Sequence, residues 1–143
     1  MNRFENKICL VTGAGSGIGK ATALAFAKEQ GLVVAADINE NAAKAIAATI
    51  EANGGKAIAL KADISDRSEV KSMIAKTIDA VGRLDCAVNC AGIAGRHSLN
   101  IDEYPEEEWI SMININLIGT YFCVKDEITQ MLKNGGGNIV NVA

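Results

Sequence analysis

The stretch from Lys7 to Gly19, KICLVTGAGSGIG, decides the fold, because in it an apolar run passes directly into a glycine-rich turn. An uninterrupted apolar run is typical of a strand that is buried on both faces of a parallel sheet. The helical spacing of apolar residues that follows extends from Ile18 to Gln30, and Gly31 ends it. A strand, a glycine turn and a helix in this order predict the first half of a βαβ unit.

The rest of the chain repeats this alternation of strand and helix. Apolar runs predict further strands at residues 32–37, 57–61, 84–89 and 138–142. Amphipathic patterns predict further helices at residues 41–53, from the capping Asp66 to about Gly82, and from Pro105 to about Lys133. These connections are long enough to join parallel strands through right-handed crossovers. The predicted fold class is therefore α/β, a doubly wound parallel sheet of the Rossmann type, whose ligands bind at the carboxyl ends of the strands.

Length and composition indicate one globular domain, because the chain has 143 residues, of which 49% are hydrophobic and 22% charged. The formal net charge of -3 gives no basic surface for nucleic acid or for an anionic membrane. No apolar run reaches the roughly 18 residues that span a bilayer, and the first residues lack the apolar core of a signal peptide. We therefore expect a cytoplasmic protein without nucleic-acid or membrane partners.

The four cysteines, Cys9, Cys86, Cys90 and Cys123, fit a reducing compartment. None forms a Cys-x-x-Cys pair, and the sole histidine, His97, lies away from them in the sequence, so no metal site is predicted. All four are interpreted as buried, reduced thiols, with a reactive or regulatory cysteine as the alternative. His97 is interpreted as a solvated loop residue, with donation to a substrate oxygen as the alternative.

The glycine turn and the acidic residue that ends the second strand form a candidate nucleotide site. Glycines let the backbone approach a pyrophosphate, which then rests on the helix N-terminus. The residues expected to do this are Gly13, Ser16, Gly17, Ile18 and Gly19. Asp37, roughly 20 residues further on, can bind both ribose hydroxyls and would repel a 2′-phosphate. Neither Ser16 nor Ile38 beside Asp37 supplies a basic side chain, so the pattern favours NAD over NADP. The alternatives are a glycine turn without a ligand and an ordinary strand-end Asp.

The spacing Thr-Gly-x-x-x-Gly-x-Gly at residues 12–19 resembles the short-chain dehydrogenase/reductase family, in its branch of short subunits, and the resemblance covers the whole chain. It implies that Asp63 and Ile64 contact the adenine. It also implies that Asn89-Cys90-Ala91-Gly92 matches the family's Asn-Asn-Ala-Gly, which supports the sheet and approaches the cofactor ribose. Cys90 is the departure from that motif. Asn116 matches the family's helix asparagine, which bends the helix locally and holds a water of the proton relay.

The resemblance further implies NAD-dependent transfer of a hydride between the nicotinamide and a secondary alcohol or ketone, in a homodimer or homotetramer. The family's catalytic serine, tyrosine and lysine are expected after the fifth strand. Residues 1–143 are therefore predicted to be the NAD-binding Rossmann domain of a longer protein, truncated after strand five and inactive alone. Tyr121 and Lys125 have the catalytic Tyr-x-x-x-Lys spacing but precede the fifth strand, so they are interpreted as a packing tyrosine and a surface lysine. Trp109 is interpreted as a core or interface anchor.

Two other functions are weighed against this one. A non-enzymatic NAD-binding module, acting as a redox sensor or scaffold, would share the fold and the glycine turn. The gene sequence after Ala143 would discriminate, since a serine followed by Tyr-x-x-x-Lys would indicate the enzyme. A nucleotide-sugar epimerase or dehydratase is disfavoured, because those relatives space the turn Gly-x-x-Gly-x-x-Gly.

Overall fold

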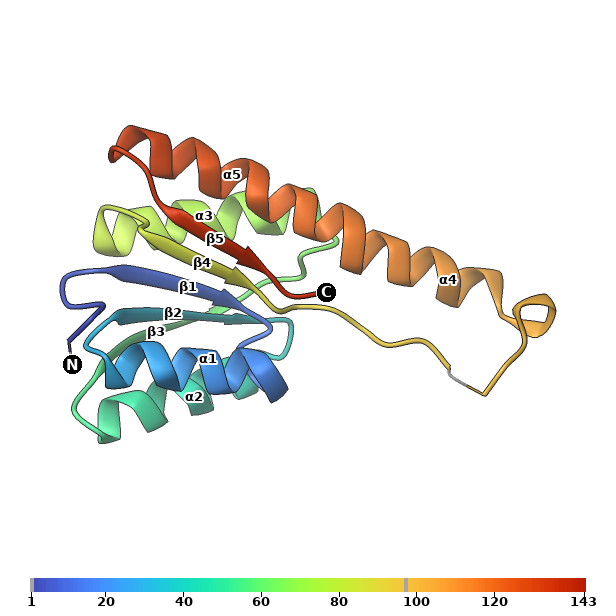
Figure 1. The fold of residues 1–143 in the computed structure, drawn as a ribbon, viewed down its shortest axis with the longest axis horizontal. Helices are drawn as coiled ribbons and strands as arrows, with labels where there is room; N and C mark the ends of the chain where they lie inside the picture. The colour runs from blue at the N-terminus through green and yellow to red at the C-terminus, as the bar shows by residue number, and fades with distance from the viewer. Residues whose placement is uncertain (1, 97) are drawn as a thin grey trace.

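The computed structural model describes residues 2–96 and 98–143. In this described part, five parallel strands form one sheet in the order β3-β2-β1-β4-β5 (Figure 1). The strands are β1 Ile8–Thr12, β2 Leu32–Asp37, β3 Lys56–Lys61, β4 Cys86–Asn89 and β5 Asn138–Asn141. The strand order reverses between β1 and β4, which is where doubly wound sheets bind their ligands. The predicted fold class is confirmed.

Helices cover both faces of the sheet, with α1 and α2 on one face and α3 and α5 on the other (Figure 1). Their bounds are α1 Gly17–Lys28, α2 Glu40–Ala52, α3 Arg67–Val81, α4 Glu106–Met112 and α5 Thr120–Lys133. A 3₁₀ helix, η1 Ile101–Glu103, precedes α4, and a π-helical stretch, η2 Ile113–Gly119, joins α4 to α5. α4 and the loop that leads to it project beyond the sheet (Figure 1).

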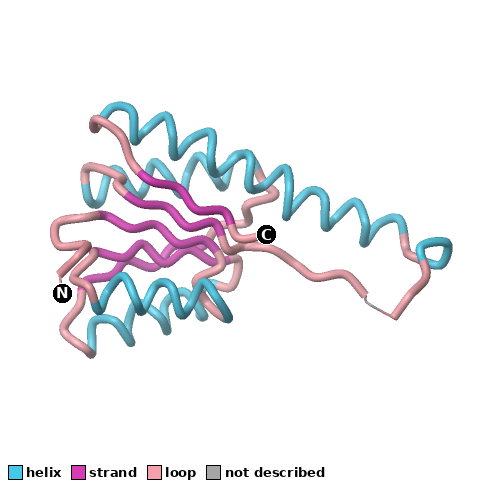
Figure 2. Tube along the Cα trace, viewed as in Figure 1, coloured by secondary structure: helices cyan, strands magenta, loops and turns pink. Residues whose placement is uncertain are grey.

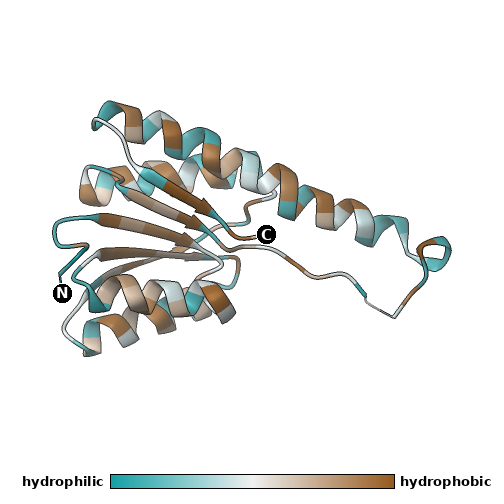
Figure 3. Ribbon diagram, in the orientation of Figure 1, coloured by the Kyte–Doolittle hydropathy of each residue, from teal (hydrophilic) through white to brown (hydrophobic). Residues whose placement is uncertain are grey.

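The apolar strand runs place one core on each face of the sheet, because successive side chains of a strand point to opposite faces. Figure 3 shows that hydrophobic residues predominate along the strands of the sheet. Towards α1 and α2, the buried members are Val11, Ala14, Ala23, Val33, Ala35, Ile46 and Ile50. Towards α3 and α5, they include Leu10, Val34, Val70, Met73, Ile74, Cys123 and Met131. Both faces of the sheet are therefore covered, as a parallel sheet requires.

The first helices differ from the prediction only at their ends. α1 stops at Lys28, earlier than the predicted Gln30, because Gln30 takes a left-handed backbone with φ of 69°. The amide of Gly31 then donates to the carbonyl of Phe26 at 2.9 Å, which satisfies one of the last helical acceptors. α2 starts at Glu40 because Asn39 caps it, its side chain accepting from the amide of Ala42 at 3.1 Å.

β4 begins at Cys86 and not at the predicted Leu84. The carboxylate of Asp85, just before the strand, accepts from the amide of Ile8 through Oδ2 at 2.9 Å, and its other oxygen pairs with the guanidinium of Arg83. The main chain of Asp85 is paired as well, since its amide donates to the carbonyl of Ile8 at 3.1 Å and its carbonyl accepts from the amide of Asn138 at 3.0 Å. The buried carboxylate thus adds a side-chain contact to the main-chain pairing at the start of the strand.

The long helix predicted from Pro105 to Lys133 is continuous but not uniform. Pro105 is the capping residue and Glu106 the first helical residue, one position later than predicted. Glu106, Glu107 and Glu108 occupy the first turn, where acidic side chains complement the helix dipole. Further along, in the π-helical stretch η2, each main-chain hydrogen bond joins residues five apart instead of the four of an α-helix. The sequence therefore gives the length of this helix but not the change of repeat inside it.

The prediction that all four cysteines are buried is confirmed for two of them. Cys9 and Cys123 are buried, whereas Cys86 and Cys90 are only partly buried because they lie at the two ends of the short strand β4. Cys9 and Cys86 are register partners on adjacent strands. Within residues 2–96 and 98–143, no group of three or more candidate ligands is placed to hold a metal ion. In the same residues, none of the helices has the length and apolar character needed to cross a bilayer.

Candidate functional site

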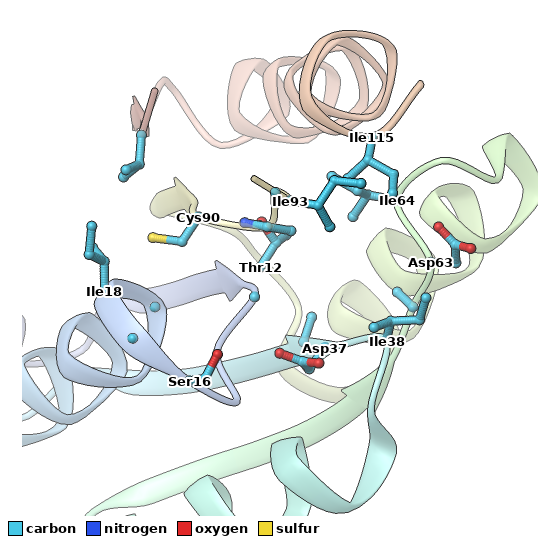
Figure 4. A pocket seen from close by; sticks show the side chains of 18 residues that line it. Thr12, Ser16, Ile18, Asp37, Ile38, Asp63, Ile64, Cys90, Ile93 and Ile115 are labelled. Atoms are coloured by element: carbon cyan, nitrogen blue, oxygen red, sulfur yellow. The ribbon is translucent and has the colours of Figure 1, made fainter. Parts of the chain in front are cut away.

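A cavity of about 550 Å³ lies at the carboxyl ends of the central strands, beside the glycine turn (Figure 4). The tube in Figure 2 shows that the loops leaving these strand ends meet at that edge of the sheet. All but one of the residues predicted to bind the cofactor line it: Gly13, Ser16, Gly17, Ile18, Gly19, Asp37, Ile38, Asp63, Ile64, Ala91 and Gly92. Its size falls in the range of small-molecule sites.

The glycine turn is shaped by close backbone contacts. Gly13 has a φ of +65°, and a Cβ on it would lie 2.8 Å from the Cα of Ala91, which leaves no space for a side chain. A Cβ on Gly19 would lie 2.1 Å from the carbonyl oxygen of Gly13. α1 therefore packs directly on the turn, and the turn packs directly on the segment that follows β4.

The first turn of α1 is available to an anion. Ser16 is the capping residue of α1, but its side chain makes no capping hydrogen bond, in contrast to Asn39 on α2 and Asp66 on α3. Gly17 faces open space, since a Cβ there would meet nothing within 4 Å. Uncapped amides at a helix N-terminus that lines a cavity form a site for a phosphate group.

The carboxylate of Asp37 stands at the end of β2 and lines the cavity next to the apolar Ile38 side chain (Figure 4). Its Oδ2 accepts from the amide of Gly15 at 2.8 Å, and its Oδ1 accepts from the amide of Asn39 at 2.9 Å. Each carboxylate oxygen has more than one acceptor position, so both can also accept from hydroxyl groups of a ligand. The two amides fix the orientation in which the carboxylate would do so.

Asp63 and Ile64 follow β3 and line the cavity together. Oδ1 of Asp63 accepts from the amide and hydroxyl of Ser65 at 2.9 and 2.7 Å. The amide of Asp63 donates to Glu69 at 2.8 Å, which ties this turn to the first turn of α3. Ile64 is buried and in addition packs on Gly119 of the long helix. These contacts hold the pair at the cavity, and its contact with the adenine stays a prediction.

Asn89 is the exception, because it does not line the cavity. Its side chain is buried and fully used by the protein: Nδ2 donates to Glu127 at 3.1 Å and to Asn141 at 3.0 Å, and Oδ1 accepts from Thr12 at 3.4 Å. Its role in cofactor binding stays a prediction, and the two hydrogens of its side-chain amide are already donated to Glu127 and Asn141. Its support of the sheet agrees with these contacts, since they join β1, β4, β5 and α5.

Asn116 lies within η2, next to the cavity but outside its lining. Its side-chain amide pairs twice with Ile93, accepting from the main-chain amide at 2.9 Å and donating to the carbonyl at 2.9 Å. The main-chain carbonyl of Asn116 accepts from the hydroxyl of Thr120 at 2.9 Å. The irregular helix at this residue agrees with the bend that the resemblance implies, and the double hydrogen bond fixes Ile93 at the cavity edge.

Tyr121, Lys125 and Trp109 lie outside the cavity. Tyr121 is 57% exposed, and the ammonium of Lys125 lies 5.9 Å from its ring centroid, so the pair is on the surface. Tyr121 is therefore not the packing tyrosine that was predicted. Trp109 is 50% exposed and contacts Tyr104 edge to face, so it is not a core residue. His97 lies outside the described residues.

Several residues that line the cavity are not among those predicted from the sequence to bind the cofactor. Three of them, Thr12, Ala36 and Ala62, are at the carboxyl ends of β1, β2 and β3, where the rule for parallel sheets could have placed them. Cys90 also lines the cavity, and burial raises the pKa of its thiol. Val142 also reaches the cavity from a strand end, since it follows β5, which pairs with β4. Ile115 carried no local signal, because it lies on the long helix and only the packing of that helix brings it to the cavity. Ile93 is held at the cavity edge by Asn116 of the same helix.

The glycine turn, the acidic strand end and the reversal of strand order define a Rossmann-type nucleotide-binding unit. The sequence model of the short chain dehydrogenase family matches residues 7–143, and the chain belongs to this family. The match covers almost the whole sequence, so the resemblance carried by the glycine spacing is confirmed.

Individual relatives agree with this family. The chain is 43% identical to a 3beta-hydroxysteroid dehydrogenase of Mediterraneibacter gnavus, over 100% of this chain and 51% of that protein. It is 39% identical to a 3-oxoacyl-(acyl-carrier-protein) reductase of Thermotoga maritima, over 99% of this chain and 56% of that protein. A crystal structure of NAD⁺-bound xylitol dehydrogenase superposes with a TM-score of 0.95 at 31% identity, over 99% of this chain and 54% of that one. The chain thus spans about half the length of the relatives that it matches.

Proposed function

We propose that this chain is the NAD-binding part of an oxidoreductase that transfers a hydride between the nicotinamide and a secondary alcohol or ketone. The observation that carries the proposal is the carboxylate of Asp37, which is held at the cavity wall by the amides of Gly15 and Asn39. A carboxylate there accepts hydrogen bonds from two ribose hydroxyls and repels a phosphate on the same ribose. NAD, when bound, would supply the hydride acceptor or donor.

The residues present fit such a cofactor from end to end. Asp63 and Ile64 form the wall for the adenine, and the uncapped first turn of α1 meets the pyrophosphate. The segment of Ala91 and Gly92 continues the wall beyond the glycine turn. Asn116 is proposed to act next to the nicotinamide, because its two hydrogen bonds hold the main chain of Ile93 at the edge of the cavity.

Titration calorimetry of the complete gene product with NADH and NADPH tests the cofactor. We expect NADH to bind at least about tenfold more tightly, since one misplaced charge costs more than 1.4 kcal/mol. Asp37→Asn keeps a hydrogen-bond acceptor but removes the negative charge. It should therefore improve NADPH binding and reduce the difference between the affinities for NADH and NADPH. Asp66→Asn, an acidic residue at the start of α3 outside the cavity, is the matched control and should leave the ratio unchanged. Equal affinities of the unmodified protein for both cofactors would refute the proposal.

Turnover with a panel of secondary alcohols and ketones tests the reaction, and separates the enzyme from an NAD-binding sensor or scaffold, which would bind without turnover.

We also propose a homodimer or homotetramer, supported by the exposed apolar side chains of the long helix, Trp109, Ile110, Leu117, Tyr121, Ile128 and Leu132. Sedimentation equilibrium would reveal a monomer if this is wrong. We also propose a cytoplasmic location, because four cysteines without a Cys-x-x-Cys pair fit a reducing compartment.

A further inference from the structure

Glu127 on α5 has a carboxyl group in the protein core. Its exposed fraction is 0%, yet among the described residues it takes part in no ion pair. Oε2 accepts from Nδ2 of Asn89 at 3.1 Å, and Oε1 has no hydrogen-bond partner in the described part of the chain. An apolar side chain would fill this position at lower cost in free energy. The position therefore keeps a carboxyl group at a cost, and its single contact indicates why.

That contact is the start of a hydrogen-bonded path to the cavity. Asn89 Nδ2 donates to Glu127 and to Asn141, while Asn89 Oδ1 accepts from the hydroxyl of Thr12 at 3.4 Å. The same hydroxyl accepts from the amide of Ala91 at 3.4 Å. Thr12 and Ala91 both line the cavity, so the path runs from the centre of the core to the wall of the site.

We propose that Glu127 is a positioning residue for the cofactor site, on which it acts through the amide of Asn89. Asn89 holds the hydroxyl of Thr12, and that hydroxyl holds the main chain at Ala91. The position of Ala91 matters because its Cα lies only 2.8 Å from where a Cβ of Gly13 would be, so any displacement moves the glycine turn. The inference rests on the proposed function, since cofactor affinity is one of its readouts.

The protonation state of Glu127 decides how firmly Asn89 is held. As a carboxylate, Oε2 is a strong acceptor for Nδ2 of Asn89. As a carboxylic acid, Glu127 is a neutral and therefore weaker acceptor for that amide. Protonation thus weakens the hold on Asn89 and loosens the wall of the site.

The surroundings allow this change near neutral pH. Burial raises the pKa of Glu127 to about 7, the hydrogen bond from Asn89 opposes the rise, and the Asp126 carboxylate adds to it. Asp126 is itself paired with Arg67 of α3. β5 has no titratable side chain, and the titratable residue of β4, Cys86, lies at the far end of the strand and faces Cys9.

NADH titrations of the complete gene product between about pH 5.5 and pH 8.5, on either side of neutrality, test the proposal. In the unmodified protein, the dissociation constant should rise about tenfold as the pH falls, which is the equivalent of one hydrogen bond. Glu127→Gln presents a neutral acceptor to Asn89 at every pH, so this variant should bind NADH weakly throughout the range and show no pH dependence. His97→Gln is a control, since histidine titrates in the same range, and it should keep the pH dependence.

A second readout needs no cofactor. Hydrogen exchange at the amide of Ala91, corrected for its intrinsic pH dependence, should be faster in Glu127→Gln and in the unmodified protein at acid pH. Cys123→Ala, one turn earlier on α5 and equally buried, is the matched core variant and should change neither Ala91 exchange nor the pH profile. A pH profile of Glu127→Gln identical to that of the unmodified protein, or an equal effect of Cys123→Ala, would overturn the proposal. Absence of NADH binding at every pH would instead refute the proposed function, and Ala91 exchange would still decide the role of Glu127.

Discussion

Replacing Gly19 by alanine tests the direct packing of α1 on the glycine turn. Gly19 does not have a left-handed backbone, so alanine is conformationally acceptable there and should favour the helix by roughly 1 kcal/mol. Its Cβ, however, would lie 2.1 Å from the carbonyl oxygen of Gly13 and 2.7 Å from the carbonyl carbon. These are main-chain atoms that no side-chain rotation can move away. The helix and the turn must therefore separate by about 1 Å, which overpacking studies put at about 1–3 kcal/mol.

The separation should affect the site more than the fold. After the gain in helix propensity, the free energy of unfolding should fall by no more than about 2 kcal/mol. Misplacement of a binding group by about 1 Å can cost about 100-fold, so NADH affinity should fall by one to two orders of magnitude. Urea unfolding and calorimetric titration measure the two effects.

Gly54→Ala is the control for this variant, since Gly54 has a φ of +80° and a Cβ there would meet nothing within 4 Å. It should lose about 1 kcal/mol through backbone strain and keep its NADH affinity. The reasoning is wrong if Gly19→Ala matches the unmodified protein in both stability and affinity.

Three further variants probe the contacts around the site. Asn116→Ala removes both hydrogen bonds to Ile93, so amide exchange at Ile93 should accelerate by about tenfold, which hydrogen-exchange mass spectrometry would measure. Arg67 holds the pKa of Asp126 below its usual range. The ion pair should therefore stabilise the protein by about 1 kcal/mol at neutral pH, and this contribution should be lost in acid as Asp126 becomes protonated. Urea unfolding of Asp126→Asn and of the unmodified protein at neutral and at acid pH would show the difference. Because the pKa of Glu127 is raised to about 7, its effect on stability depends on pH in the opposite direction. The contribution of Glu127 to the free energy of unfolding is fully present below pH 4.5 and is lost as the pH rises to about 7. The stability of the unmodified protein relative to Glu127→Gln should therefore fall by about 3 kcal/mol over that interval.

The elements that sequence analysis predicts correctly depend on local spacing. The glycine turn and Asp37 are recognisable because a tight turn, a helix start and a strand end each need particular residues at fixed distances along the chain. Asn89 shows the limit, since its motif is visible in the sequence but its side chain bonds to Glu127 and Asn141, which lie 38 and 52 residues away. Glu127 itself looks like any polar residue of an amphipathic helix, and only the packing of α5 on the sheet buries it.

The change of helical repeat in η2 sets the rotational phase of α5. Because of the π-helical stretch, the amino-terminal half of the long helix presents Ile115 to the cavity while the other half presents Cys123, Glu127 and Met131 to the core. Deleting one residue from η2 would cancel its extra residue, so a regular α-helix could lead into α5 with nearly the same rotational phase. The same deletion within α5 would instead turn everything beyond it by about 100° around the helix axis and move buried side chains off the sheet. A single-residue deletion is thus a local event in η2 but re-registers a layer of the fold when it falls in α5.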